Sequence, residues 1–148
     1  MNEKIFDPEN PKVFPVIERG VRYRNVSFSY GEELVLKKVS FDVAQGKTVA
    51  LVGESGSGKS TIADLLPRFY DVNNGEILID GVNIKDFKLE DLRAAIGVVS
   101  QESILFNDTV ANNIAFGTPN ATKDEIIEAA KVANAHDFIL GLENGYET

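Results

Sequence analysis

Residues 53–60 read GESGSGKS, and this stretch decides the fold. Glycines in such a loop let backbone N–H groups approach phosphate oxygens at dihedral angles that a side chain would forbid. The lysine adds a positive charge for the β- and γ-phosphates, and the last hydroxyl is a ligand for Mg²⁺. The stretch therefore predicts a phosphate-binding loop. The fixed positions of its pattern, GxxxxGK[ST], are filled by Gly53, Gly58, Lys59 and Ser60.

The segments on either side of the loop have the patterns of a strand and a helix. Residues 48–52 are apolar after the first position, as in a central strand buried on both faces. Residues 61–66 have apolar residues at helical spacing, and Pro67 marks the end of that helix or a bend. Strand, loop and helix in this order predict an α/β P-loop NTPase fold.

Alternating polar and apolar residues predict an antiparallel sheet beside this core. Residues 26–30 and 39–43 alternate as two half-buried strands with a turn between them. Further on, Asp80-Gly81 joins residues 75–79 to 82–84 in a hairpin. Together these stretches predict an N-terminal antiparallel β-subdomain that accompanies a partial parallel core sheet.

The remainder of the chain is mainly helical in pattern. Residues 89–96 predict a short helix that leads into a small strand at 97–100. From Thr109 onward the pattern is helical again, with a capping box at 122–125 and a last short helix around 138–140. This region predicts the start of a helical subdomain.

Composition restricts the partners of the chain. The 148 residues carry a formal net charge of −8, which argues against a nucleic-acid partner because such binding depends on basic residues. There is no cysteine, so disulfides and thiolate metal sites are excluded. No apolar run reaches the length of about 20 residues that a membrane-spanning helix needs, so we expect a soluble chain.

Other stretches at matching positions resemble the ATP-binding cassette (ABC) ATPases, in particular the exporters. Residues 26–30 resemble the A-loop, where Tyr30 matches the aromatic residue that stacks on adenine. Residues 98–102 resemble the Q-loop, where Gln101 matches the glutamine that contacts Mg²⁺. The stretch after it places Phe106 as a candidate contact with the membrane domain. The resemblance covers nearly everything after Gly20.

The resemblance implies ATP and Mg²⁺ as ligands. Lys59 is then the catalytic residue present in this chain, and Ser60 and Gln101 are the Mg²⁺ ligands. The residues expected to bind the nucleotide are Tyr30, Gly53, Glu54, Ser55, Gly56, Ser57, Gly58, Lys59, Ser60, Thr61 and Gln101.

The resemblance also has clear departures. The signature motif, the Walker B aspartate with its glutamate and the switch histidine are absent from these 148 residues. Residues 77–80 mimic a Walker B strand, but Gly81 follows Asp80, and the pair predicts a hairpin instead. His136, the single histidine, has a surface or capping role in this interpretation. We therefore expect a lead-in at residues 1–20 and an incomplete ABC-type nucleotide-binding domain at 21–148.

These observations lead to one main hypothesis and several alternatives. The chain is expected to be the ATP-binding part of an ABC exporter ATPase, working with a transmembrane permease domain and a second ATPase domain at the cytoplasmic face of a membrane. Alone, it is expected to bind nucleotide without efficient hydrolysis. The alternatives are an incomplete assembly module that needs a second polypeptide, an import ATPase, and a different P-loop enzyme such as a GTPase or kinase.

Overall fold

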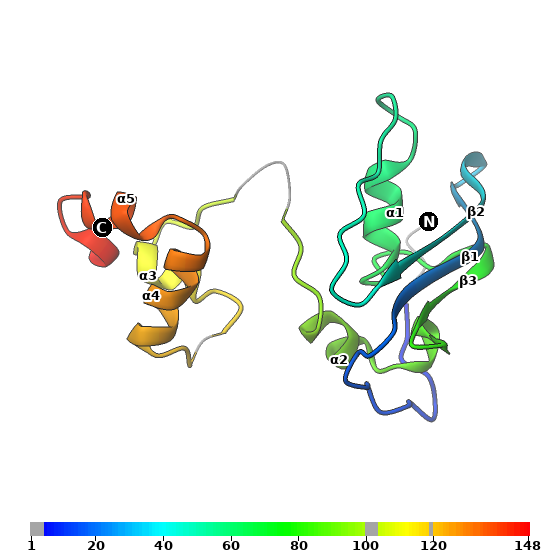
Figure 1. Cartoon of the computed structure of the whole chain (residues 1–148), viewed down its shortest axis with the longest axis horizontal. Helices are drawn as coiled ribbons and strands as arrows, with labels where there is room; N and C mark the ends of the chain where they lie inside the picture. The colour runs from blue at the N-terminus through cyan, green and yellow to red at the C-terminus, as the bar shows by residue number, and fades with distance from the viewer. Residues whose placement is uncertain (1–4, 100–103, 119) are drawn as a thin grey trace. The chain divides into compact units, whose positions relative to one another are not determined.

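The chain folds into two compact units, which are described separately. The computed structural model describes residues 5–99, 104–118 and 120–148. The first unit extends to Val98 and carries the sheet, and the second begins at Val99 and is helical (Figure 1). Among the described residues, no helix combines the length and the apolar composition that crossing a bilayer would require.

The first unit is built on an antiparallel sheet of four strands in the order β2-β1-β3-β4. This confirms the predicted antiparallel subdomain, although the first two strands are longer than predicted. The hairpin at Asp80-Gly81 is confirmed as well, with φ angles of 51° and 88°, the left-handed values that a tight hairpin turn needs. The strands are β1 (Gly20–Tyr30), β2 (Glu33–Ala44), β3 (Asn74–Ile79) and β4 (Val82–Asn83).

Helix α1 (Lys59–Leu65) covers one face of the sheet, as Figure 1 shows. Its Leu65 is fully buried among side chains from β1, β2 and β3. The hydroxyl of Tyr23, on β1, donates a hydrogen bond of 2.9 Å to the carbonyl of Ile62. Burial raises the pKa of Tyr23, so this hydroxyl stays a neutral donor. The buried apolar members of this core are Tyr23, Val26, Phe28, Leu36, Leu65, Ile77, Ile79, Ile84, Phe87 and Leu92.

The lead-in packs against the part of this core that contains Phe87. A short 3₁₀ helix, η1 (Ile84–Asp86), and helix α2 (Leu89–Ala94) flank the buried Phe87. The ring of Phe14 lies 5.0 Å from that of Phe87, and the backbone N–H of Lys12 donates to the carbonyl of Asp86 at 2.8 Å. The described part of the lead-in is therefore attached to the first unit.

Two predicted strands are wrong. Residues 48–52 have no strand pairing, and Val52 is 92% exposed. Residues 97–99 of the predicted strand 97–100 are also unpaired, with Val99 98% exposed. An extended segment becomes a strand only when a neighbour satisfies its backbone groups, and the described strands pair with one another instead. The predicted parallel sheet is thus not formed by the described residues.

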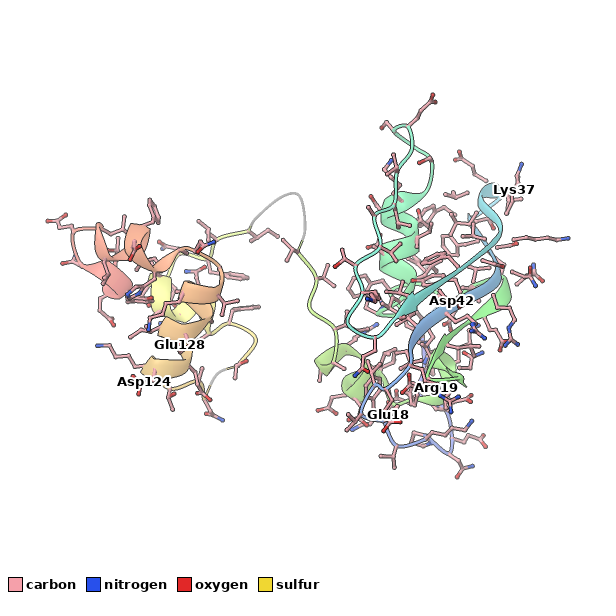
Figure 2. All side chains as sticks on the ribbon, in the orientation of Figure 1. Glu18, Arg19, Lys37, Asp42, Asp124 and Glu128 are labelled. Carbon is pink, nitrogen blue, oxygen red and sulfur yellow. The ribbon has the colours of Figure 1, made fainter. Side chains whose placement is uncertain are left out.

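The second unit is a small helical bundle. The predicted capping box is confirmed, since the hydroxyl of Thr122 and the carboxylate of Glu125 each bind the other's backbone N–H. The acidic side chains of Asp124 and Glu128 project outward from α4 (Figure 2). Its helices are α3 (Val110–Ile114), α4 (Lys123–Val132), α5 (His136–Leu140) and the 3₁₀ helix η2 (Gly145–Glu147). Its buried core is formed by Ala130, Ile139 and Tyr146.

The single histidine has a local structural contact. His136 lies at the start of α5, where its Nδ1 is 2.9 Å from the hydroxyl of Tyr146. Tyr146 belongs to the core of the second unit, so the pair ties α5 to η2. No group of histidine and acidic side chains that could hold a metal ion occurs in the described ranges.

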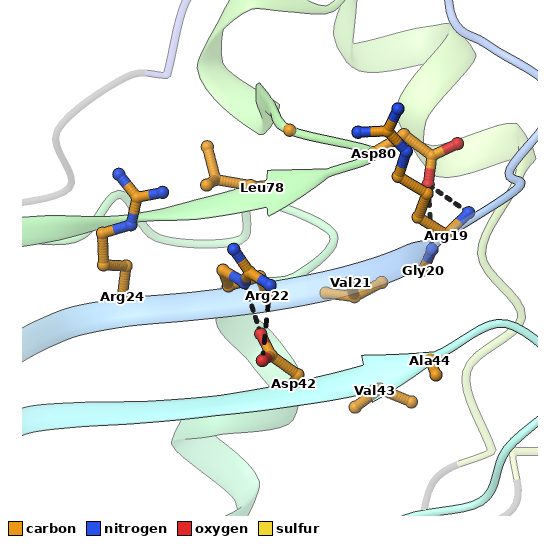
Figure 3. Close-up of a pocket in the computed structure, with 11 residues that line it drawn as sticks. Arg19, Gly20, Val21, Arg22, Arg24, Asp42, Val43, Ala44, Leu78 and Asp80 are labelled. Carbon is orange, nitrogen blue, oxygen red and sulfur yellow. Dashed lines mark hydrogen bonds and ion pairs between the residues drawn. The ribbon is translucent and has the colours of Figure 1, made fainter.

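The aspartate of the hairpin turn is bound by the lead-in. Its carboxylate accepts three backbone hydrogen bonds of 2.7–2.8 Å from the N–H groups of residues 18–20, two of which Figure 3 shows. Hydrogen bonds from Glu18 and then Gly20 are the main causes that lower the pKa of Asp80. The interpretation of Asp80 as a turn residue agrees with this arrangement.

We predict that Asp80→Asn lowers the midpoint of thermal unfolding at neutral pH. Asparagine tolerates the left-handed backbone of the turn but removes the charge that the three N–H groups bind. A carboxylate with a lowered folded pKa stabilises the fold above its ordinary unfolded pKa, and this contribution is lost as the pH falls through the folded value. The difference in unfolding midpoint between the wild type and Asp80→Asn should therefore become smaller at acidic pH.

Asp42→Asn provides the matched control, because Asp42 forms only an exposed ion pair with Arg22. Thermal melts of all three proteins, followed by circular dichroism over a pH series, make the measurement. A difference in unfolding midpoint between the wild type and Asp80→Asn that does not change with pH would contradict the proposed role of the carboxylate.

Candidate functional site

The loop at residues 53–60 leads directly into α1. Gly56 and Gly58 have φ angles of 79° and 86°, values that favour glycine. A backbone hydrogen bond of 3.3 Å from Ser57 to Glu54 closes a turn between them. All residues of the loop except Gly58 and Lys59 are exposed, including Ser55 and Ser60. Most residues of the loop are thus exposed to solvent.

Gly58 is the point where the loop passes β2. A Cβ atom added at this position would lie 2.7 Å from Leu36 Cδ2 and 3.2 Å from Val35 Cγ1. Any side chain would therefore collide with β2, in addition to the strain of a positive φ. Gly58 is also the N-cap of α1, so the close approach fixes where this helix begins.

The side chain of Lys59 lies over its own loop. Its Nζ donates to the carbonyl of Glu54 at 2.7 Å, to that of Gly53 at 3.0 Å and to Ser57 Oγ at 3.3 Å. These contacts gather Gly53, Glu54, Ser57 and Lys59 into one cluster. The positive charge is therefore held at the mouth of the loop, where an anion approaching the backbone would meet it.

Thr61 connects the loop with β1. It is only 6% exposed, and its Oγ1 lies 3.4 Å from the hydroxyl of Tyr30. Tyr30 is the last residue of β1 and is 42% exposed. The predicted adenine platform and the phosphate loop are thus brought together, although they are far apart in the sequence. The exposed ring of Tyr30 thus lies on the same unit as the loop and in contact with the helix that follows it.

Sequence reasoning missed the aromatic neighbours of Tyr30. Phe28 and Tyr70 both contact its ring edge to face, with ring centroids 4.8 Å and 5.1 Å away. Tyr70 belongs to the segment after α1, where the adjacent aromatic residues Phe69 and Tyr70 follow the helix-ending Pro67. This pair of adjacent aromatic residues was the feature of the sequence that could have indicated an aromatic neighbour for Tyr30. Whether Tyr70 contacts Tyr30 depends on the path of the chain from α1 back to β1, which the sequence pattern does not specify.

Two further predictions concern the region after the loop. Gln101 lies outside the described residues. In the second unit, Phe106 is 47% exposed and stacks on Phe116, with 4.2 Å between the ring centroids. Asn113 fixes the backbone there, because its side chain accepts from the N–H of Phe106 and donates to its carbonyl. Phe106 is therefore a fixed, partly exposed aromatic residue.

A pocket of about 320 Å³ lies elsewhere on the first unit, between the ends of β1, β2 and β3 (Figure 3). Several of its charged groups already have partners. Arg22 is paired with Asp42, and Asp80 is bound by backbone N–H groups. The pocket is not lined by the phosphate loop or by Tyr30. We therefore place the candidate site at the loop and not at this pocket.

Comparison with known proteins identifies the family of the chain. Residues 36–144, which include the loop and Thr61, match the family described as ABC transporter. The chain belongs to the ABC transporter family. Its core therefore has the P-loop NTPase fold of the ABC ATPases, of which the described residues form the antiparallel subdomain, the phosphate loop and a helical part.

Several members of the family are closely similar. An ATP-dependent lipid A-core flippase of Syntrophus aciditrophicus (strain SB) is 50% identical over 97% of this chain and 24% of the relative. A Bacillus subtilis (strain 168) protein named "Putative multidrug export ATP-binding/permease protein" is 54% identical over 89% of this chain and 23% of the relative. A solved bacterial Atm1-family ABC exporter with ATP bound matches with a TM-score of 0.90 and 48% identity.

The chain spans about a quarter of the length of these ABC proteins. The Atm1-family match covers 97% of this chain and 25% of the exporter. The ABC relationship therefore extends over nearly the whole chain, while most of each relative lies outside the comparison.

We predict that Gly58→Ala destabilises this ABC chain more than Gly56→Ala. Both substitutions force alanine into a left-handed backbone, at a cost of about 1–2 kcal/mol each. Only Gly58→Ala adds a collision with Leu36 and Val35, whereas nothing lies within 4 Å of a Cβ at Gly56. Overpacking of this kind costs about 1–3 kcal/mol more. Urea denaturation of both variants measures the difference, and equal free energies of unfolding would contradict the proposed contact with β2.

Proposed function

We propose that this chain is the ATP-binding part of the ATPase domain of an ABC exporter. The observation that carries the proposal is the contact between Tyr30 and Thr61, at 3.4 Å between their hydroxyl oxygens. Through it, an exposed aromatic ring lies beside the helix that begins at the phosphate loop. The purine base stacks on Tyr30 in this proposal, and the phosphates bind the loop.

Each polar group of the loop then has a chemical task. The backbone N–H groups of residues 53–60 bind phosphate oxygens, and Lys59 neutralises charge on the β- and γ-phosphates. Lys59 exchanges its present carbonyl partners for phosphate oxygens, which are stronger acceptors because they are charged.

When bound, Mg²⁺ would neutralise negative charge on the triphosphate. The exposed hydroxyl of Ser60 fits this ion, because Mg²⁺ keeps several waters and needs few protein ligands. Gln101 is proposed as a second contact with the ion. Efficient hydrolysis also needs a group that orients the attacking water, so we propose that this chain alone binds Mg-ATP with little turnover.

The proposed role of the whole protein is export across a membrane. The names of the flippase and of the multidrug export relative support export over import. The parent would then couple ATP binding and hydrolysis to a transmembrane permease domain, with a second ATPase domain as its partner at the cytoplasmic face. The exposed Phe106 is the proposed contact with the permease.

We predict that Lys59→Ala weakens the binding of Mg-ATP by about 10- to 100-fold. The substitution removes a charged hydrogen-bond donor, which is worth about 1.5–3 kcal/mol. Calorimetric titration of the 148-residue chain measures the affinity, and phosphate release from the same samples measures turnover.

Lys47→Ala is the matched control, since Lys47 is an exposed lysine outside the loop. Titration with Mg-GTP in parallel separates an ATP-binding chain from a general P-loop enzyme. Unchanged affinity in Lys59→Ala would show that the loop does not bind the phosphates.

A second candidate function is an assembly module that a second polypeptide completes. The observation that favours it is the apolar segment 48–52, in which Val52 is 92% exposed without a strand partner. Unpaired extended segments of this kind accept a strand from another chain.

If a second copy of this chain supplies the strand, the chain self-associates as its concentration rises, and Val52→Lys suppresses the association. A charged residue opposes strand addition without a cost to the folded unit, because this position is exposed. Val13→Lys is the matched control, since Val13 is 91% exposed in the lead-in. Sedimentation velocity over a concentration series is the measurement. A single-chain mass at every concentration would count against assembly through a second copy of this chain.

A further inference from the structure

Three aromatic rings meet where β1 ends beside the segment that follows α1. The rings of Tyr30 and Tyr70 are perpendicular, with an interplanar angle of 89° and 5.1 Å between centroids. Phe28 is also perpendicular to Tyr30 at 4.8 Å, and its centroid lies 5.5 Å from that of Tyr70. Each ring thus contacts the other two. Edge-to-face pairs of this geometry are favourable because the positive edge of one ring meets the negative face of the other.

The three rings differ in exposure. Phe28 is 4% exposed and belongs to the core, whereas Tyr30 and Tyr70 are each 42% exposed. Phe28 therefore forms the buried base of the cluster, and the two tyrosines reach solvent. Tyr30 is in contact with Phe28, Tyr70 and the hydroxyl of Thr61, so its ring is restrained from three directions.

The segment that carries Tyr70 is itself firmly anchored. The guanidinium of Arg68 is nearly buried and binds both carboxylate oxygens of Asp71, at 3.0 and 3.1 Å. Arg93 donates to the carbonyls of Pro67 and Arg68, at 2.9 and 2.8 Å. These bonds restrain the chain on both sides of Tyr70, through the backbone of residues 67 and 68 before it and the side chain of Asp71 after it. A ring held in this way can act as a support for its neighbour.

We propose that Tyr70 is a positioning residue for nucleotide binding, which holds the ring of Tyr30 in the orientation that accepts a purine base. The inference rests on the proposed function of the site. Tyr70 acts through Tyr30 and does not itself contact the base. Its ring is the active group, because the contact with Tyr30 is made by the ring.

The proposal predicts a selective loss of base binding in Tyr70→Leu. This variant keeps an apolar side chain but removes the ring, so Tyr30 loses one restraint. The affinity for Mg-ATP should fall about three- to tenfold, the range expected for one aromatic pair. The affinity for Mg-tripolyphosphate, which has phosphates but no base, should stay within twofold. Tyr70→Phe keeps the ring and should bind both ligands as the wild type does.

Tyr30→Leu and the double variant Tyr30→Leu/Tyr70→Leu complete the calorimetric experiment. Once Tyr30 is absent, Tyr70 has no ring to position, so the double variant should bind Mg-ATP no more weakly than Tyr30→Leu. A further loss in the double variant would mean that Tyr70 contacts the nucleotide itself, which overturns the proposal. An equal loss of Mg-ATP and Mg-tripolyphosphate in Tyr70→Leu would overturn it too, because it indicates general damage to the site.

A spectroscopic measurement tests the ring contact without nucleotide. The chain has four tyrosines, so labelling with 3-fluorotyrosine gives a simple ¹⁹F spectrum in which single variants assign the signals. The Tyr30 signal should shift in Tyr70→Leu, while that of Tyr146, which packs in the core of the second unit, stays in place. An unchanged Tyr30 signal would overturn the proposal.

The outcomes also distinguish a failure of the proposed nucleotide binding from a failure of the positioning role of Tyr70. If the wild type binds neither Mg-ATP nor Mg-tripolyphosphate, the proposed function fails, and the positioning role fails with it. If the wild type binds both and Tyr70→Leu binds Mg-ATP normally, only the role of Tyr70 is overturned.

Discussion

The close approach of Gly58 to β2 is the constraint on which the rest of the first unit depends. A side chain at Gly58 would have to displace the buried Leu36, and α1 begins at this point. Leu65 therefore reaches the same core as Leu36, and Thr61 faces the end of β1. The phosphate loop is thus a functional element that also determines how helix and sheet pack. A substitution that changes the geometry of the loop at Gly58 is therefore expected to change the stability of the core as well.

The sequence predicted best the elements whose causes are local. The capping box at Thr122 and the Asp80-Gly81 hairpin need only a few neighbouring residues, and both occur as predicted. The phosphate loop belongs to the same class, because glycines and a lysine at fixed spacing specify it. The family assignment followed from this loop together with the stretches around Tyr30 and Gln101.

The predictions that failed, or were missing, depend on residues distant in the sequence. Residues 48–52 have the composition of a buried strand, but a strand also needs neighbours that the described sheet does not provide. The role of Tyr70 could not be predicted because it depends on the path by which the chain returns to β1. That path is fixed by the contact of Arg93 with residues 67 and 68, which no local pattern reveals.

The binding of Asp80 by the lead-in has a consequence for the chemical ageing of the chain. An aspartate followed by glycine is prone to isomerise, because the glycine nitrogen can attack the aspartate carboxyl carbon and form a succinimide. Here the carboxylate is held by three backbone N–H groups, and its lowered pKa keeps it ionised and hence a poor electrophile. The folded chain thus opposes covalent damage at the Asp80-Gly81 turn, and this protection depends on the lead-in remaining bound to Asp80.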